Sequence, residues 1–241
     1  MITIQQVPET GSTNADLATR LRAGERLSEG HWLVADRQTA GRGRQGREWF
    51  DGTGNFMGST IVRPAGGDPA ASSLPFMAGL AVYETVLALF PVPGTLQLKW
   101  PNDLMLKGAK LAGILLEAQG DAVIVGIGVN LTFAPSLPDR ATIALADCGP
   151  APDRDAFAQS LATSFAAEIE RWRRYGVAAL LTRWQAAAHD EGTTMTVHAP
   201  GGETVRGNYA GLAADGALQL RLADGSLRAI HAGEINLTNG N

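Results

Sequence analysis

Residues 41–50 are GRGRQGREWF, and the fold class depends on how this stretch is interpreted. Its glycines, Gly41, Gly43 and Gly46, match the G-x-G-x-x-G fingerprint of dinucleotide-binding folds. That fingerprint should open a helix, but the following residues carry Gly52 and Gly54 and then alternate like a strand. The chain also has no G-x-x-x-x-G-K-[ST] string. The sequence therefore argues against a Rossmann fold and against a P-loop nucleotide site.

The gaps between these glycines are filled by Arg42, Arg44 and Arg47. The formal net charge of the 241-residue chain is −4, so the arginines form a local basic site and not part of a broad basic surface. Glycines let a backbone approach an anion closely, and guanidinium groups offer forked donors to carboxylate or phosphate. We therefore interpret the stretch as a loop for a small anionic ligand, and we expect no DNA partner.

Composition excludes several other classes of protein. Cys148 is the only cysteine, so neither a disulfide framework nor a cysteine-based zinc site is expected, and the four histidines show no metal-ligand spacing. The first residues, MITIQQVPETGSTN, lack the pattern of a signal peptide. No apolar run reaches the roughly 18–20 residues that span a bilayer. These features predict a soluble, cytoplasmic protein with no membrane partner.

Hydrophobic periodicity predicts an α+β organisation. After residue 189 the sequence changes to short strands separated by glycine turns, which is typical of a small all-β unit. We therefore expect two domains, residues 1–189 and 190–241. In the first, we expect helices at 12–24, 72–90, 157–172 and 177–189, strands at 31–36, 55–62 and 95–100, and a hairpin of 110–118 with 121–131.

Three further stretches carry candidate chemistry. In KWPNDLML (99–106), Pro101 favours an extended Trp100, so we expect Asn102 and Asp103 in a turn at the strand end. An amide and a carboxylate there could hold a nucleotide or its Mg²⁺, although ordinary turn chemistry also explains the pair. Lys110 begins the apolar strand KLAGILLE, where Gly113 leaves room beside it, and a lysine can also simply protect a sheet edge. In GIGVN (126–130), glycines in a buried strand indicate close approach of a backbone or a ligand.

Five strings, in this order and spacing, resemble the biotin protein ligase family, also called biotin–[acetyl-CoA-carboxylase] ligase. The resemblance covers residues 9–131 and extends more weakly to the C-terminal DGALQL and GEI strings. No helix-turn-helix segment precedes it, which is typical of the short form without the DNA-binding domain. The fold implied is a mixed β-sheet flanked by helices, like class II aminoacyl-tRNA synthetases, followed by a small SH3-like β-barrel. The strings are GSTN (11–14), QTAGRGRQGREW (38–49), KWPNDL (99–104), KLAGILLE (110–117) and GIGVN (126–130).

The resemblance implies a two-step ligase reaction. Biotin is activated by ATP as biotinyl-5′-AMP, and a lysine of a biotin carboxyl carrier domain then attacks this adenylate. The substrates implied are biotin and ATP with Mg²⁺, and the partner is the carrier domain of a biotin-dependent carboxylase. Family members can also pair sheet edges, so a homodimer is compatible with the resemblance.

The resemblance also assigns roles to single residues. It implies that the glycine-arginine loop closes over biotin and the adenylate, that Trp49 stacks on adenine, and that Arg47 is a further candidate contact. Arg44, Lys110 and Asp103 would be catalytic, with Asp103 the candidate Mg²⁺ ligand. The biotin site would comprise Ser12, Thr13, Asn14, Gln38, Gly41, Arg42, Arg44, Lys110 and Gly113. The ATP site would comprise Arg42, Arg44, Trp49, Asn102, Asp103, Lys110 and Asn130.

Two alternatives remain open from the sequence. A lipoate-protein ligase shares the fold and the acyl-adenylate chemistry, but lipoate lacks the ureido donors that would pair with Gln38 and the Ser12–Thr13 hydroxyls. A non-catalytic regulator that binds biotin or a nucleotide would not need Lys110 together with the loop arginines. The ligase interpretation is therefore favoured.

Overall fold

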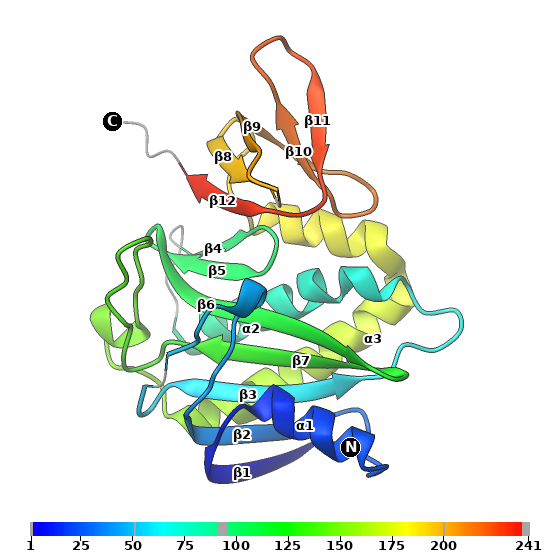
Figure 1. The fold of residues 1–241 in the computed structure, drawn as a ribbon, viewed down its shortest axis with the longest axis vertical. Helices are drawn as coiled ribbons and strands as arrows, with labels where there is room; N and C mark the ends of the chain where they lie inside the picture. Colours follow the sequence, from blue (N-terminus) through cyan, green and yellow to red (C-terminus); the bar gives the residue numbers. More distant parts are fainter. Residues whose placement is uncertain (1, 51, 91–95, 200, 238–241) are drawn as a thin grey trace.

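The structure, a computed structural model, describes residues 2–50, 52–90, 96–199 and 201–237 (Figure 1). Its main element is a seven-stranded mixed sheet with the strand order β1-β2-β3-β7-β6-β5-β4. Only β1 and β2 are parallel, and the other neighbours are antiparallel. The strands are β1 (Thr3–Thr10), β2 (His31–Gln38), β3 (Phe56–Val62), β4 (Leu96–Lys99), β5 (Asp103–Leu106), β6 (Ala109–Gln119) and β7 (Ala122–Val129).

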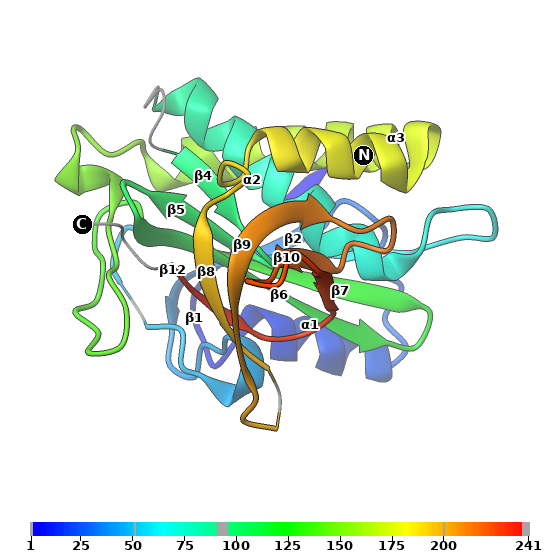
Figure 2. The same cartoon turned by 90° about the horizontal axis from the view of Figure 1, so that it is seen from above.

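Helices cover both faces of this sheet. Figure 2 shows α1 (Thr13–Arg22) on one side, with α2 (Leu74–Leu89) and α3 (Arg154–Ala186) on the other. The main hydrophobic core lies between the sheet and α2 and α3, and a smaller cluster lies under α1. Burying apolar faces on both sides of a sheet is what stabilises such a layered domain. Three short 3₁₀ helices, η1 (Arg44–Gly46), η2 (Ala71–Ser73) and η3 (Leu145–Asp147), lie in the connections.

α3 consists of two helical segments that meet at Gly176. Its N-terminus is capped by Asp153, whose carboxylate accepts hydrogen bonds from the backbone N–H groups of Asp155 and Ala156. Gly176 has φ of +74°, which interrupts the helix and permits a change of direction. The two helices expected at 157–172 and 177–189 are therefore confirmed as the two parts of α3.

The other expected elements are also confirmed, including the β6–β7 hairpin, but two strands were not predicted. β1 is a polar strand at the sheet edge, and β5 has only four residues. The placement of Asp103 in a turn was wrong. Asn102 does lie in a turn, but Asp103 begins β5 because it pairs with Lys99 on one side and with Gly113 on the other.

The C-terminal strands form a second sheet in the order β11-β10-β9-β8-β12. In the described residues 96–199 and 201–237, the two outer strands β11 and β12 do not pair with each other. The expected closure into an SH3-like barrel is therefore not confirmed. The apolar side chains of this sheet belong to the same core cluster as α2 and α3. The boundary near residue 190 stays a prediction. The strands are β8 (Thr194–His198), β9 (Thr204–Leu212), β10 (Leu218–Arg221), β11 (Leu227–Ile230) and β12 (Glu234–Leu237).

The segment Ala71–Leu89 is long and apolar enough to cross a membrane by length and composition, with a mean hydropathy of 1.4. The expectation that no apolar segment reaches this length was therefore wrong. In this fold 61% of that window is buried, and α2 packs against α3 and strands of the main sheet. Such burial is typical of the core helix of a globular domain, which passes the same test of length and composition. The absence of a membrane partner therefore stays our prediction.

His189 gives the fold a predicted sensitivity to acid. Burial, and then the positive charge of Lys99, lower the pKa of His189 to about 4 from its ordinary 6.5, and its buried Nε2 has no partner among the described residues. As the pH falls, His189 therefore becomes protonated at a higher pH in the unfolded chain than in the folded chain. We expect the free energy of unfolding to decrease by about 2–3 kcal/mol between pH 7.5 and 4.5 on account of His189 alone. Chemical denaturation at both pH values should show that His189→Gln loses this part of the decrease.

The control for this measurement is His231→Gln, because His231 is largely exposed and its ion pair with Asp215 lies at the surface, where such pairs contribute little. This variant should keep most of the pH dependence of the wild type. Identical pH dependence in His189→Gln and the wild type would contradict the prediction.

Candidate active site

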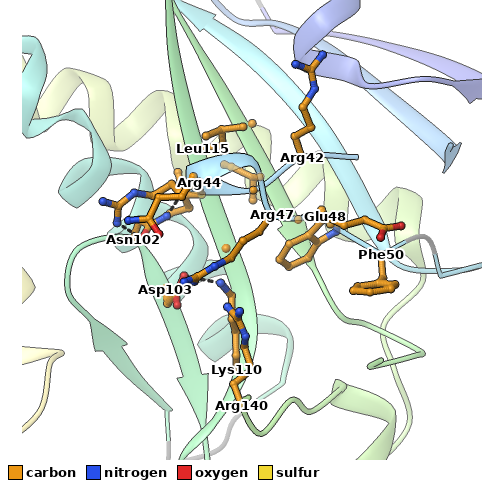
Figure 3. Close-up of a pocket in the computed structure, with 18 of the residues that line it drawn as sticks. Arg42, Arg44, Arg47, Glu48, Phe50, Asn102, Asp103, Lys110, Leu115 and Arg140 are labelled. Atoms are coloured by element: carbon orange, nitrogen blue, oxygen red, sulfur yellow. Dashed lines mark hydrogen bonds and ion pairs between the residues drawn. The ribbon is translucent and has the colours of Figure 1, made fainter. Parts of the chain in front are cut away.

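A cavity of about 340 Å³ lies on the α1 side of the sheet, beneath the glycine-arginine loop (Figure 3). Its floor is formed by residues of β7, β6, β5 and β4, and its far wall by the 135–142 segment and the start of β12. With the exception of Gly41, every residue assigned to the site from the sequence lines this cavity. Gly41 lies beside it, and the carbonyl group of Gly41 accepts a hydrogen bond from Trp49 N–H at 3.0 Å.

One end of the cavity carries a buried network of neutral polar groups. The side-chain oxygen Oε1 of Gln38 accepts hydrogen bonds from the backbone N–H of Thr13 at 2.8 Å and from its hydroxyl at 3.1 Å. The hydroxyl oxygens of Thr13 and Ser59 are 2.6 Å apart, and Ser59 donates to Asn14 Oδ1 at 2.6 Å. Ser12 is buried beside them. This end of the cavity offers amide and hydroxyl groups, which suit a neutral hydrogen-bonding ligand.

The sequence analysis missed Ser59 within this network and the exposed carboxylate of Glu117 beside it. Ser59 is fully buried in strand β3, beside the equally buried Thr60, and buried polar residues in a largely apolar strand were a usable signal. Glu117 accepts a hydrogen bond from Asn14 Nδ2 at 2.7 Å. Because Asn14 and Glu117 are 103 residues apart, no local pattern could have paired them.

Glycines in β6 and β7 make room for Asn14 and Trp49. A Cβ atom on Gly126 would lie 2.4 Å from Asn14 Oδ1, and one on Gly128 would lie 2.2 Å from Trp49 Cε2. Gly113 is similarly close to Trp49, at 3.0 Å from Cζ3. The close approach expected at the glycines of β7 is present, but the approaching groups are side chains and not the backbone or ligand that we predicted. One face of the Trp49 ring is covered by the strands, so adenine stacking on its other face stays a prediction.

Gly128→Ala is expected to displace Trp49 and weaken ligand binding. The new methyl group cannot coexist with the indole ring in its present position, since real Cβ atoms essentially never approach another heavy atom within 3.0 Å. We expect biotin affinity to fall by about 10-fold or more, on the scale of 1–3 kcal/mol for an overpacked site. Isothermal titration calorimetry with biotin checks this. Gly66→Ala is the matched control, because a Cβ at Gly66 meets open space. Unchanged affinity in Gly128→Ala would contradict the prediction.

The glycine-arginine loop folds back on itself. Gly43 N–H donates to the Arg47 carbonyl at 2.7 Å, and Arg42 forms an antiparallel bridge with Glu48. The tip contains Gln45 with φ of +58° and Gly46 with φ of +74°. A glycine fits the second of these positions without strain. The loop therefore reverses direction and does not open an α-helix, which confirms the argument against a Rossmann fingerprint.

The three loop arginines point to different places. Arg44 Nη1 donates to Asn102 Oδ1 at 3.0 Å, and burial lowers the pKa of Arg44. Arg47 forms a two-pronged ion pair with Glu234 of β12, a contact 187 residues away that the sequence did not indicate. Arg42 points away from Lys110 (Figure 3). Of the three, Arg44 is the one whose side chain contacts Asn102, in the turn before β5.

Lys110 and Asp103 form the centre of the site. Their side chains are joined by an ion pair of 2.7 Å between Lys110 Nζ and Asp103 Oδ1, and are 18% and 17% exposed. Lys110 Nζ also lies 5.8 Å from the centroid of the Trp49 ring. Asn130 donates from Nδ2 to the backbone carbonyl of Ile143 at 3.2 Å, so the donor side of its amide holds the 131–145 loop. The spacing KWPND…K thus brings a cation and an anion together.

No group of three or more His, Cys, Asp or Glu side chains in the described part of the chain could hold a metal ion. Asp103 is one carboxylate, and Lys110 already binds it. Mg²⁺ is commonly held by one or two carboxylates together with substrate phosphates and water. These residues therefore fit an ion that arrives with a nucleotide better than a resident metal centre.

Charge distinguishes this cavity from the rest of the molecule. Its lining includes six basic side chains and four acidic ones, a surplus of two positive charges in a chain of net charge −4. A local positive field in a concave site attracts anionic ligands. A neutral polar pocket joined to a cationic site, on a mixed sheet flanked by helices, is the arrangement of a ligase that activates an acid with a nucleotide.

The chain belongs to the biotin/lipoate A/B protein ligase family, whose model matches residues 9–132. A second model, the biotin protein ligase C terminal domain, matches residues 193–237. The chain is 42% identical over 224 residues to a biotin--[acetyl-CoA-carboxylase] ligase of Paracoccus denitrificans, covering 88% of this chain and 91% of that protein. It is 40% identical over 205 residues to the ligase of the same name from Mycobacterium tuberculosis, covering 83% of this chain and 76% of that one.

A solved structure agrees with these sequence matches. The fold is similar to that of a biotin protein ligase from Aquifex aeolicus in complex with biotin and ATP, with a TM-score of 0.86 and 26% identity. The match covers 100% of both chains. The α+β fold class expected from the sequence is thereby confirmed.

Proposed function

We propose that this chain is an ATP-dependent ligase that activates biotin as biotinyl-5′-AMP and transfers the biotin to a lysine of a biotin carboxyl carrier domain. One observation carries the proposal: a single cavity joins a neutral hydrogen-bonding pocket to a cationic site. Biotin has a neutral ureido ring at one end and a carboxylate at the other, so it matches both. The names of the two bacterial relatives and the ligands of the Aquifex aeolicus structure support the same activity.

The neutral pocket would recognise the ureido ring. A ureido group presents two N–H donors and one carbonyl acceptor, and Ser12, Thr13, Asn14 and Gln38 supply hydroxyl and amide groups of both kinds. Because these groups are buried, a ligand that left them unpaired would bind much more weakly. Gly41 and Gly113 would allow close approach of the backbone, and Arg42 would contact the carboxylate at the other end of biotin.

The cationic site would bring two anions together. The biotin carboxylate must attack the α-phosphate of ATP, so positive charge has to offset the repulsion as the two approach. Lys110 and Arg44 would supply that charge, while Asp103 and Asn102 would hold them in place. No covalent enzyme intermediate is required, since positioning and charge provide the rate enhancement.

The nucleotide would lie over the turn after β4. Trp49, Asn102 and Asn130 line this part of the cavity and are our candidates for contacts to adenosine, with Arg42 and Arg44 near the phosphates. Mg²⁺ bound to ATP would neutralise phosphate charge, and Asp103 is the carboxylate available to hold it. A cytoplasmic location and the absence of DNA binding are further predictions that accompany this function, and a homodimer is compatible with it.

Incubation of the protein with biotin, ATP and a biotin carboxyl carrier domain tests the proposal, with streptavidin blotting of the carrier as the readout. Labelling that requires ATP supports it. A parallel reaction with lipoate separates the alternatives, because modification of a carrier by lipoate and not by biotin would indicate a lipoate-protein ligase. Biotin binding without pyrophosphate release would instead indicate a regulator.

A further inference from the structure

A row of directly paired residues crosses the sheet beneath the cavity. Gly128 of β7 pairs with Gly113 of β6, and Gly113 pairs with Asp103 of β5. Asp103 pairs with Lys99, the last residue of β4. Directly opposed residues of neighbouring antiparallel strands point to the same face of a sheet. The side chain of Lys99 therefore lies on the cavity face, one strand beyond Asp103, and it lines the cavity.

Lys99, like Arg44 and unlike Arg47 and Lys110, has no anionic partner among the described residues. Arg47 pairs with Glu234, and Lys110 pairs with Asp103. Lys99 forms no hydrogen bond or ion pair with any residue in the described ranges. Burial lowers the pKa of Lys99, an effect that the nearby charge of Asp103 only partly opposes. The ammonium group is thus a partly desolvated charge that a bound anion would stabilise.

The simplest structural role for Lys99 does not fit its surroundings. A lysine at a sheet edge commonly prevents pairing with another chain. Here the outer edge of β4 is already occupied, since Leu98 N–H donates to the Ala187 carbonyl at 2.7 Å and Leu98 forms a parallel bridge with Ala188. The buried residues of β4, Leu96 and Leu98, face the core on the other side of the sheet. Neither edge protection nor core packing therefore explains the position of Lys99.

The order of groups across the sheet matches the geometry of phosphoryl transfer. The neutral pocket lies near Ser59 on β3, the Lys110–Asp103 pair lies on β6 and β5, and Lys99 lies on β4. In an in-line displacement the leaving group departs on the side opposite to the attacking oxygen. Neighbouring strands are about 4.8 Å apart, so a side chain on β4 lies about one such step beyond the Lys110–Asp103 pair on the side away from β3. A carboxylate that attacks from the β3 side pushes the leaving group toward β4.

We propose that Lys99 binds the pyrophosphate leaving group of ATP during adenylate formation, an inference that rests on the proposed ligase function. As the carboxylate oxygen bonds to the α-phosphorus, the bond from that phosphorus to the bridging oxygen breaks. The electron pair stays on this oxygen of pyrophosphate. The Lys99 ammonium donates a hydrogen bond to the departing group and offsets its growing charge, and no proton is transferred.

The test compares ligands that carry the leaving group with ligands that lack it. Lys99→Met is expected to bind α,β-methylene-ATP and pyrophosphate about 10- to 100-fold more weakly, the scale of one lost charge-assisted hydrogen bond. Its affinities for biotin and for a sulfamoyl analogue of biotinyl-AMP should stay within about twofold of wild type, because neither carries pyrophosphate. Lys99→Arg should recover part of the pyrophosphate affinity. Circular dichroism verifies the fold of each variant.

The matched control is Lys107→Met, because Lys107 is an exposed lysine on the neighbouring β5–β6 turn and does not line the cavity. It should bind all four ligands like the wild type. Wild-type pyrophosphate affinity in Lys99→Met would overturn the inference, as would an equal loss of the biotinyl-AMP analogue, which would place Lys99 at the α-phosphate. If the wild type releases no pyrophosphate from biotin and ATP, the proposed function itself fails, which is a separate outcome.

Discussion

Replacing Lys110 by alanine is expected to slow formation of biotinyl-AMP by about 10²–10³-fold, the scale of losing one preorganised donor to a developing charge. In the proposed reaction Lys110 lies between the biotin carboxylate and the α-phosphate. Its loss removes positive charge and also leaves Asp103 without its partner, 17% exposed and facing incoming anions. Pyrophosphate release measured with biotin and ATP, without a carrier domain, isolates this step from transfer.

A second variant separates the two parts of this effect. Lys110→Ala combined with Asp103→Ala removes the stranded carboxylate and also the candidate Mg²⁺ ligand. A rate above that of Lys110→Ala indicates repulsion by the stranded carboxylate, and a lower rate indicates that Asp103 holds the ion. Lys107→Ala serves as the control for a lost lysine outside the cavity and should keep the wild-type rate. A wild-type rate of pyrophosphate release in Lys110→Ala would rule out the role assigned to Lys110.

Local patterns in the sequence were sufficient for most of the helices and strands. The helices α1 and α2 and the hairpin of β6 and β7 each depend on patterns among neighbouring residues, and each was predicted correctly. β5 was missed because a four-residue strand directly after a proline turn has too few residues to show alternation. Its pairing with β4 and β6 is a tertiary property.

The residues of the candidate site also differ in whether local sequence patterns could identify them. Lys110, Asp103 and Asn102 come from strings that are close in the sequence, and the structure brings them together as expected. Glu234 could not be found in this manner. Glu234 reaches the site from β12, through a contact with Arg47 that spans 187 residues. Such pairs depend on how the C-terminal sheet packs on the first domain, and a single sequence does not contain that information.

The C-terminal sheet is more than an appended unit. Trp100 Nε1 donates to the Gly216 carbonyl at 3.0 Å, and Gln185 Oε1 accepts from Leu212 N–H at 2.8 Å. These bonds tie the sheet to the β4–β5 turn and to the end of α3, while its apolar residues share the main core. A chain ending at residue 189 would expose part of that core. Point variants therefore test the roles of this sheet better than truncation does.

Arg44→Ala is expected to slow adenylate formation by about 10²–10³-fold, similarly to Lys110→Ala. Arg44 is a partly buried guanidinium group whose hydrogen-bond acceptor, the Asn102 amide oxygen at 3.0 Å, is neutral. Burial disfavours its charged form, so the site retains an unneutralised cation at a cost in stability. An anion bound beside it would recover that cost, which is the physical reason to place the α-phosphate there.

Arg44→Ala should also release bound biotinyl-AMP faster, because the same guanidinium contacts the adenylate after it forms. Rapid dilution of the preloaded protein, followed by measurement of free biotinyl-AMP, records this leakage. Asn102→Ala should have a smaller effect, about 10-fold, since it loosens the guanidinium and does not remove it. In the double variant the effect of Asn102→Ala should largely disappear, because nothing is left for Asn102 to position. If the two substitutions instead act additively, Asn102 does not work through Arg44, and wild-type adenylation in Arg44→Ala would remove Arg44 from the mechanism.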